Sequence, residues 1–232
     1  MASPTVPERI FSVYCLVIFA LLAVLALTIN LFLPSLRARR RVAGAFSRAF
    51  FRAAAIPLRI EGMERLPAEP CVVVANHASY IDGIVAAAAL PPDFAFVIKK
   101  EMVRVPLASL LLRRLGSAFV ERFDRHKGGA DARRVWKLAA TGQSLVFFPE
   151  GTFAASRQVG RFLGGAFATA ERSNMPIVAA AIQGTRDVLP AGGIMVFRRA
   201  IRFAILEVLE PKDARERSRE LIAQAVGEPL AP

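Results

Sequence analysis

The chain has 232 residues, 54% of them hydrophobic, and its mean hydropathy of +0.41 is high for a soluble protein. Its formal net charge of +12 favours anionic partners, such as lipid headgroups or an acidic carrier protein. Nucleic acid is disfavoured because the sequence has no zinc-finger spacing, no basic heptad helix and no aromatic RNA-binding signature. Two cysteines within apolar runs argue against a disulfide framework, and two separated histidines argue against a His-rich metal site.

Residues 10–33 read IFSVYCLVIFALLAVLALTINLFL, carry no formal charge and are enough to cross a bilayer as one helix. The run is too long for the core of a cleaved signal peptide, and no small-x-small cleavage site follows it. Four arginines follow in LPSLRARRR, and positive flanks stay on the cytoplasmic side. We therefore expect a cytoplasmic-membrane protein with the rest of the chain on the cytoplasmic face. Asn30 and Pro34 leave open whether the helix crosses the membrane or bends back.

A second helix is predicted over residues 42–56, VAGAFSRAFFRAAAI, because Pro57 ends it. One interpretation is an interfacial helix, with its phenylalanines in the lipid and Arg48 and Arg52 among the phosphates. The alternative is a core helix that packs on the following domain. We assign residues 1–57 to a membrane anchor with an interfacial helix, and residues 58–232 to one globular domain.

From residue 58 onward, β-like runs alternate with helix-like runs, which predicts an α/β fold, an αβ sandwich around a mixed, largely parallel sheet. Several strands read as continuous apolar runs, as expected when both faces are covered. The predicted strands are LRIEG, CVVVAN, FAFVIK, SAFVERF, SLVFFP, PIVAAAIQG and AIRFAILEVLE, and the predicted helices cover residues 84–90, 105–115, 130–141, 164–172 and a segment after residue 213. In such sheets, sites collect at the carboxyl ends of strands.

The stretch NHASYIDG directly follows the predicted strand CVVVA. In one interpretation, Asp82 holds the His77 imidazole in one tautomer and stabilises its charged form, which leaves the other ring nitrogen as a general base. In the alternative, Ser79 and Asp82 form a capping box that opens the helix YIDGIVAAAAL, and His77 only occupies the turn. This stretch alone does not decide between a catalytic pair and a helix cap.

Two further stretches end predicted strands. In LVFFPEGTF, Gly151 lets the backbone approach a ligand closely, the amides beyond it can hold an oxyanion or a phosphate, and Glu150 can accept a hydrogen bond from a substrate hydroxyl. In GSAFVERF, the planar guanidinium of Arg122 suits phosphate oxygens. Taken singly, a tight turn with a solvated glutamate and a surface strand with alternating charge explain these stretches better.

The combination is more specific than its parts. The patterns N-H-x-x-x-x-D, G-x-x-F-V-x-R and F-P-E-G-T occur in this order within one small domain, after an apolar N-terminus. Over residues 58–211 the chain resembles the glycerolipid acyltransferase family, which includes the lysophosphatidic acid acyltransferases. The stretches IKKEMVRVPL, GGAFATA and MPIVAAAIQGTR also look like this family. The resemblance implies an αβ sandwich and makes residues 58–232 an acyltransferase domain.

The resemblance further implies a membrane-bound enzyme without cofactor or metal. It would move a fatty acyl group from acyl-CoA or acyl-carrier protein to the hydroxyl of a lysophospholipid, foremost 1-acyl-glycerol-3-phosphate, giving phosphatidic acid in phospholipid biosynthesis. In this family the motif histidine is the base and the aspartate orients it, and these roles fall to His77 and Asp82. The residues that bind the substrate, commonly at the acceptor phosphate, are then Asn76, Arg122, Glu150, Gly151 and Thr152.

Two departures from the family pattern remove positive charge from the expected acceptor site. Phe153 follows E-G-T where many members carry arginine, and Leu163 replaces the usual lysine. Arg157, Arg161 or Arg186 can compensate as ligands of the acceptor phosphate. The departures leave the acceptor open, so a remodelling acyltransferase or transacylase for another lysolipid is one alternative.

Two alternatives come from other classes of protein. A serine hydrolase that uses Ser79 is disfavoured because no G-x-S-x-G elbow is present. A non-catalytic membrane protein that binds anionic lipid would show lipid binding but no turnover.

The predicted helix over residues 105–115 has two interpretations. It forms part of an apolar groove for the acyl chain, around Leu110 and Leu111, with Arg113 and Arg114 at the level of the headgroups. Alternatively, it is a plain core helix.

Overall fold

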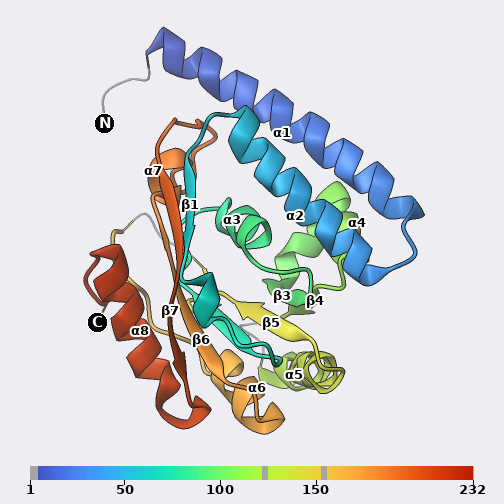
Figure 1. The fold of residues 1–232 in the computed structure, drawn as a ribbon, viewed down its shortest axis with the longest axis vertical. Coiled ribbons are helices and arrows are strands. Elements are labelled where there is room, and N and C mark those ends of the chain that lie inside the picture. Colours follow the sequence, from blue (N-terminus) through green and yellow to red (C-terminus); the bar gives the residue numbers. More distant parts are fainter. Residues whose placement is uncertain (1–4, 122–124, 153–155, 232) are drawn as a thin grey trace.

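The computed structural model describes residues 5–121, 125–152 and 156–231, with only the backbone for residues 125–130 (Figure 1). The chain begins with a helical hairpin, α1 (Val6–Phe32) and α2 (Leu36–Ala53). A capping box between Thr5 and Glu8 opens α1, and the Ser35 side chain caps α2. Helix α2 therefore begins six residues before the predicted start, and it includes the arginine-rich segment. Among the described residues, α1 is the one helix long and apolar enough to cross a membrane.

Most arginines of α2 contact protein rather than the surroundings. Arg39 donates to the Leu33 carbonyl at 2.7 Å, Arg40 to the Leu115 carbonyl at 2.9 Å, and Arg48 to the Ala88 carbonyl at 2.8 Å. These carbonyls lie at the C-terminal ends of helices, where cations offset the helix dipole. Phe50 and Phe51 on the same helix are buried. The contacts of Arg48 and the phenylalanines favour the packed-helix interpretation of α2.

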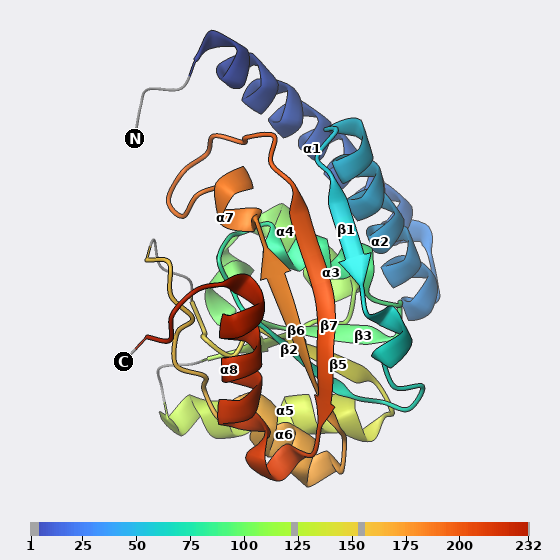
Figure 2. The ribbon, with the colours of Figure 1, turned by 60° about the vertical axis from the view of Figure 1, so that its left-hand side comes forward.

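One seven-stranded sheet forms the centre of the molecule (Figure 2). Its spatial order is β1-β7-β6-β2-β5-β3-β4, and β6 and β7 pair antiparallel, whereas the other neighbouring strands pair parallel. The mixed, largely parallel sheet predicted from the sequence is thus confirmed, with one strand for each of the seven predicted runs. The strands are β1 (Leu58–Glu61), β2 (Val72–Ala75), β3 (Phe94–Lys99), β4 (Ala118–Val120), β5 (Ser144–Phe147), β6 (Ile177–Gln183) and β7 (Ile201–Leu209).

Helices cover both faces of the sheet (Figures 1 and 2). They are α3 (Asp82–Ala89), α4 (Pro106–Arg114), α5 (Arg125–Ala140), α6 (Gly165–Ser173), the short α7 (Thr185–Val188) and α8 (Ala214–Val226). Because side chains alternate along a strand, Val73 and Ala75 join a core with α2 and α3, whereas Val72 and Val74 join a core with α5, α6 and α8. All four are fully buried, as expected for a central strand covered on both sides.

Candidate active site

The first and third sequence motifs meet at one edge of the sheet. Strands β2 and β5 are parallel neighbours, so their carboxyl ends lie side by side. His77 follows β2 by two residues and Glu150 follows β5 by three. The backbone N–H of His77 donates to Glu150 Oε1 at 2.7 Å, which joins the two strand ends directly.

His77 and Asp82 lie within hydrogen-bond distance. The His77 Nδ1 atom is 2.8 Å from Asp82 Oδ2, and the same oxygen accepts from the N–H groups of Ala78 and Ser79 at 2.7 and 2.8 Å. Asp82 is completely buried at the start of α3, where the helix dipole favours a carboxylate. An ionised carboxylate only accepts hydrogen bonds, so it places the proton of a neutral imidazole on Nδ1 and the proton-accepting lone pair on Nε2.

The capping-box alternative is also partly realised. Asp82 accepts from the Ser79 N–H, as the last residue of such a box does, but the Ser79 hydroxyl donates to the Leu189 carbonyl at 2.7 Å. One carboxylate therefore fixes both the turn and the imidazole, and the two interpretations do not exclude each other.

The imidazole is held on a second side by an aromatic ring. The His77 side chain is 20% exposed and stacks on Phe148, with ring centroids 4.6 Å apart. Phe148 is the first residue after β5. The ring therefore has one orientation set by Asp82 and Phe148 while an edge remains accessible.

Both carboxylate oxygens of Glu150 are bound to backbone. Oε1 accepts from His77 and Oε2 accepts from the N–H of Gly160 at 2.7 Å. Burial raises the pKa of Glu150 above its ordinary value, and the two N–H donors partly oppose that shift. In this geometry Glu150 connects the loop at residue 160 to the turn at residue 77. The sequence suggested a different role for Glu150, as an acceptor for the substrate hydroxyl, and that role stays a prediction.

Gly151 has the positive φ of +80° that disfavours any other residue, and its N–H donates to the Phe148 carbonyl at 3.1 Å. This turn leaves Thr152 exposed at the border of the cavity described below. Asn76, in contrast, is 5% exposed, and its amide exchanges two hydrogen bonds with the backbone of Ile182, at 2.8 and 2.9 Å. These two hydrogen bonds connect the end of β2 to β6. Contact of Asn76 with a substrate stays a prediction.

The structure describes three of the four arginines that were predicted to bind the acceptor phosphate. Arg122 lies outside the described residues. Arg157 pairs with Asp187, and the Arg186 side chain, 11% exposed, donates to the Ser156 carbonyl and pairs with Glu228. Arg161 is exposed. Arg157 and Arg186 are thus engaged in joining the loop that follows E-G-T to α7 and to the C-terminal segment.

An apolar cavity of about 370 Å³ begins at His77, Gly151 and Thr152. It extends between the helical hairpin, α3, β3 and α4, and its lining includes Phe19, Ala26, Phe46, Phe50, Ile84, Ala87, Phe96, Met102, Leu111, Leu112 and Leu115. The sequence predicted an apolar groove at Leu110 and Leu111. The structure places Leu111 in the lining, whereas Leu110 is 41% exposed and does not line the cavity.

Two cationic side chains of this region have contacts that the sequence did not suggest. Arg114 donates to the carbonyls of Asn30 and Leu31 at 2.8 Å and thus caps the end of α1, and its place at the level of the headgroups stays a prediction. Lys99, to which the sequence assigned no role, lines the cavity together with His77. It ends β3, the neighbour of β5, and its position at a strand end was the signal that could have identified it.

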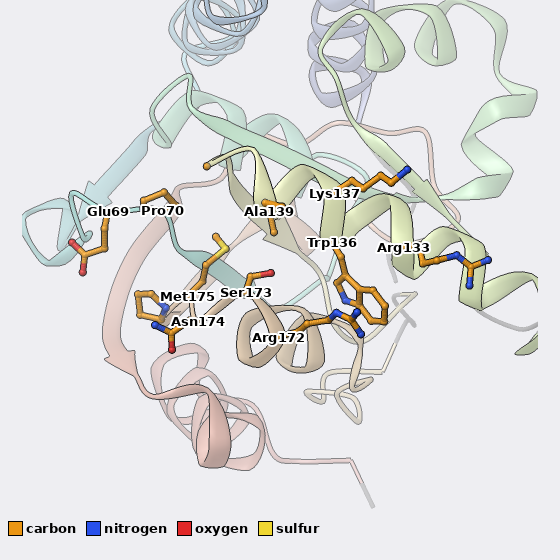
Figure 3. A pocket seen from close by; sticks show the side chains of 13 residues that line it. Glu69, Pro70, Arg133, Trp136, Lys137, Ala139, Arg172, Ser173, Asn174 and Met175 are labelled. Atoms are coloured by element: carbon orange, nitrogen blue, oxygen red, sulfur yellow. The ribbon is translucent and has the colours of Figure 1, made fainter.

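A larger groove of about 700 Å³ lies at the opposite ends of the strands (Figure 3). Pro70, Gly142 and Pro176 border it and precede β2, β5 and β6. Arg172 lies over the Trp136 ring, 3.9 Å from its centroid. No described residue of the three sequence motifs lines this groove, so the candidate active site is the cavity at His77. Across the described residues, no group of three or more His, Cys, Asp or Glu side chains could hold a metal ion.

Comparisons with known proteins find similar chains among acyltransferases. A 1-acyl-sn-glycerol-3-phosphate acyltransferase of Brassica napus chloroplasts is 32% identical over 135 residues, covering 57% of this chain and 39% of that protein. A lyso-ornithine lipid O-acyltransferase of Pseudomonas aeruginosa is 32% identical over 141 residues, covering 59% of this chain and 52% of that protein. The chain thus matches about half or less of the length of these relatives.

The fold also has a solved counterpart. The crystal structure of the 1-acyl-sn-glycerophosphate acyltransferase PlsC of Thermotoga maritima superposes with a TM-score of 0.78 at 21% identity, covering 95% of this chain and 96% of that one. A family model described as Acyltransferase matches residues 57–183, more than half of the chain and all three motifs. The chain therefore belongs to the acyltransferase family.

Proposed function

We propose that the chain is a membrane-bound O-acyltransferase that moves a fatty acyl group from a thioester to the hydroxyl of a lysophospholipid. The observation that carries this proposal is the buried Asp82–His77 pair at the mouth of an apolar cavity. The relatives named above act on 1-acyl-sn-glycerol-3-phosphate or on lyso-ornithine lipid. We take 1-acyl-glycerol-3-phosphate as the favoured acceptor, with phosphatidic acid as the product, and acyl-CoA or acyl-carrier protein as the donor.

A hydroxyl is a poor nucleophile at neutral pH, so a base has to take its proton as it attacks. His77 Nε2 takes that proton, the hydroxyl oxygen bonds to the thioester carbon, and Asp82 stabilises the charged imidazole. Collapse of the tetrahedral intermediate breaks the carbon–sulfur bond, and the proton on His77 passes to the leaving thiolate. A positioned base of this kind contributes roughly 10²–10⁴-fold to the rate.

The oxyanion of the intermediate needs donors other than the amides of the first motif. Those of His77, Ala78 and Ser79 already donate to Glu150 or Asp82. Thr152, which is exposed at the border of the cavity, can offer its hydroxyl and its amide as donors. We assign the oxyanion to Thr152, and we assign Asn76 and Glu150 to positioning.

The charge of the acceptor phosphate requires a cation near His77. Lys99 is the one Lys or Arg among the described residues that line the cavity, so we assign it to the phosphate. Arg161 is exposed in the loop that follows E-G-T and carries the second positive charge. This assignment moves the phosphate away from Arg157 and Arg186, which are paired.

The membrane association follows from α1 and the cavity. Near one end of α1, the Ser12 hydroxyl accepts from the Val196 N–H at 2.9 Å, and near the other end Arg114 binds the last carbonyls. A helix that contacts the domain at both ends lies along it, so we propose that α1 inserts sideways into one leaflet, at the cytoplasmic face of the cytoplasmic membrane. Lipid acceptors then enter the cavity from the leaflet. We keep residues 1–57 as the anchor and residues 58–232 as the acyltransferase domain.

The test compares the purified wild type with His77→Ala in detergent. Labelled acyl-CoA and acyl-carrier protein are offered with lysophosphatidic acid, lyso-ornithine lipid and other lysolipids. We expect wild-type transfer to lysophosphatidic acid and its loss in the variant, with membrane binding and thermal unfolding unchanged. Transfer only to lyso-ornithine lipid would keep the mechanism and replace the acceptor. Turnover that survives in His77→Ala, or no transfer by the wild type with any pair, would overturn the proposal.

A further inference from the structure

The C-terminal part of the chain is connected to the candidate active site through one peptide group. The carbonyl of Val159 and the N–H of Gly160 belong to the same planar peptide unit, and in a trans peptide they point in opposite directions. The N–H donates to Glu150 Oε2 at 2.7 Å. The carbonyl accepts from Arg219 Nη2 at 3.2 Å and from the Ala231 N–H at 2.9 Å.

Arg219 binds this loop with both edges of its guanidinium. Nε donates to the Gly160 carbonyl at 2.9 Å, and Nη2 also donates to the Ala231 carbonyl. The residue lies on α8 and is 8% exposed, unusually buried for an arginine. A fork with two donor edges fixes the orientation of the peptides around Gly160 in a way that a single donor does not.

The site of Gly160 leaves little room for a side chain beside Glu150. A Cβ atom built there would lie 2.8 Å from Glu150 Oε2 and 3.4 Å from Glu150 Cγ. Such a Cβ would displace the carboxylate that accepts the His77 N–H. The contact is therefore close enough for the loop to set where Glu150 lies.

We propose that Arg219 is a positioning residue for the acyl transfer, which acts through the Val159–Gly160 peptide and Glu150 on the backbone of His77. The proposal rests on the function proposed above. Three consecutive contacts carry it, from Arg219 to the peptide, from the peptide to Glu150, and from Glu150 to His77. A cation at the carbonyl polarises the peptide and strengthens its N–H as a donor to the carboxylate. The C-terminal segment thereby sets the position of the general base without touching substrate.

The experiment uses the full chain with two variants and two matched controls. Arg219→Gln removes the charge and the fork, and Gly160→Ala displaces Glu150. Arg217→Gln makes the same change on the same helix at a side chain that is 52% exposed, and Gly165→Ala adds a methyl group that meets nothing within 4 Å. We expect Arg219→Gln and Gly160→Ala to lower kcat by roughly 10- to 100-fold, because small misplacements of a reacting group have effects of this size. KM is expected to change less than about 3-fold, and both controls to match the wild type.

A double variant separates positioning from general loss of structure. Because Arg219 acts through Glu150, Arg219→Gln should add little to the loss caused by Glu150→Gln alone. Arg219→Lys, which keeps the charge and one donor, should recover part of kcat. Independent losses that multiply in the double variant, or full activity of Arg219→Gln beside an inactive His77→Ala, would overturn the inference and leave the proposed function intact.

Hydrogen exchange gives a readout that does not depend on activity. The backbone amide of His77 is protected by Glu150, so exchange in a peptide that contains residue 77 should accelerate in Arg219→Gln and stay unchanged in Arg217→Gln. Equal exchange in all variants would overturn the inference even if the wild type showed no transfer, whereas absent wild-type transfer alone would overturn only the proposed function.

Discussion

At the scale of single residues, the candidate site consists of carboxylates that organise backbone. The Asp82 carboxylate accepts three hydrogen bonds and the Glu150 carboxylate accepts two, and all but one of the donors are backbone N–H groups. The one side-chain donor is the His77 imidazole. A turn held this way presents Nε2 at the cavity without any reorganisation during the reaction, which is what general-base catalysis requires.

Asp82→Asn tests this arrangement directly. The amide keeps the shape of the carboxylate, and its oxygen can accept from His77, Ala78 and Ser79 in place of Oδ2, but it lacks the negative charge that stabilises a charged imidazole. We expect kcat to fall at least about 100-fold, within the range for loss of a positioned base. The measurement is steady-state acyl transfer. A variant with more than a tenth of wild-type kcat would contradict the role of Asp82.

The raised pKa of Glu150 predicts that the stability of the protein depends on pH. Its folded-state pKa is raised by burial, so between the unfolded and folded pKa values the folded chain binds more protons than the unfolded chain. The contribution of this group to the free energy of unfolding therefore decreases as pH rises through that window and stays at its lower value above it. We expect the melting temperature of the wild type, relative to Glu150→Gln, to fall as pH rises from about 4.5. A relative melting temperature that rises over this range would contradict the assignment.

Sequence reasoning could identify residues whose contacts lie within a short stretch of the chain. The spacing of His77 and Asp82 spans a strand end and the first turn of a helix, so their contact follows from local geometry. The second oxygen of Glu150 meets Gly160 across a loop, and Gly160 depends on Arg219 from a distant helix. No short pattern specifies such contacts, because tertiary packing determines them.

At the scale of secondary-structure elements, the helices around the cavity are fixed by arginines at helix ends. Arg39, Arg40, Arg48 and Arg114 each bind backbone carbonyls near the end of another element. A guanidinium that meets carbonyls is satisfied without a carboxylate, which explains how an arginine-rich helix packs inside the protein. From sequence alone, Arg48 and Arg52 allowed either a helix among lipid phosphates or a packed core helix, because a charge pattern does not distinguish lipid oxygens from backbone oxygens.

Helix α4 supports a matched pair of substitutions. Leu111 lines the cavity, whereas the adjacent Leu110 is exposed. We expect Leu111→Trp to shift acyl-donor preference toward shorter chains, because the larger side chain fills space that the acyl chain would occupy. Leu110→Trp should keep the wild-type preference. Both are compared in competition assays with donors of different chain length, and an unchanged profile in Leu111→Trp would argue against acyl binding in this cavity.

At the scale of the whole molecule, we propose that the side covered by the helical hairpin faces lipid. Helix α1 is the outermost layer there, beyond α2 and α3 (Figure 1), and many of its large apolar side chains are exposed. The contacts of Ser12 and Arg114 hold α1 against the domain near both its ends. Because these contacts hold α1 along the domain, we propose that the helix does not stand across the bilayer with the domain outside it.

This arrangement predicts a membrane topology. Cysteines introduced at Glu8 and at Arg217 should react with a membrane-impermeant maleimide from the same side of sealed vesicles. The background is low because Cys15 and Cys71 are buried, and burial raises the pKa of the Cys71 thiol to about 11. Labelling of the two positions from opposite sides would show that α1 spans the membrane.

The overall fold was predictable to a large extent because each of the seven strands lies in a β-like run of the sequence, and several of these runs are continuously apolar. The order of the strands was not, since the antiparallel insertion of β7 between β1 and β6 depends on contacts between distant parts of the chain. The cavity was predictable only in part. Its lining combines four helices with β3, and the period of α4 alone does not tell which of its leucines turns inward.

The place of β1 in the sheet has a consequence for synthesis of the protein. Its single neighbour is β7, and roughly 140 residues separate the two strands, so at about 5–20 residues per second β1 stays unpaired for roughly 7–30 s of translation. The hairpin ahead of β1, with its apolar helix α1, leaves the ribosome during this interval, before the sheet that it covers is complete. The apolar helix therefore has time to contact a bilayer before the rest of the chain closes the sheet beside it.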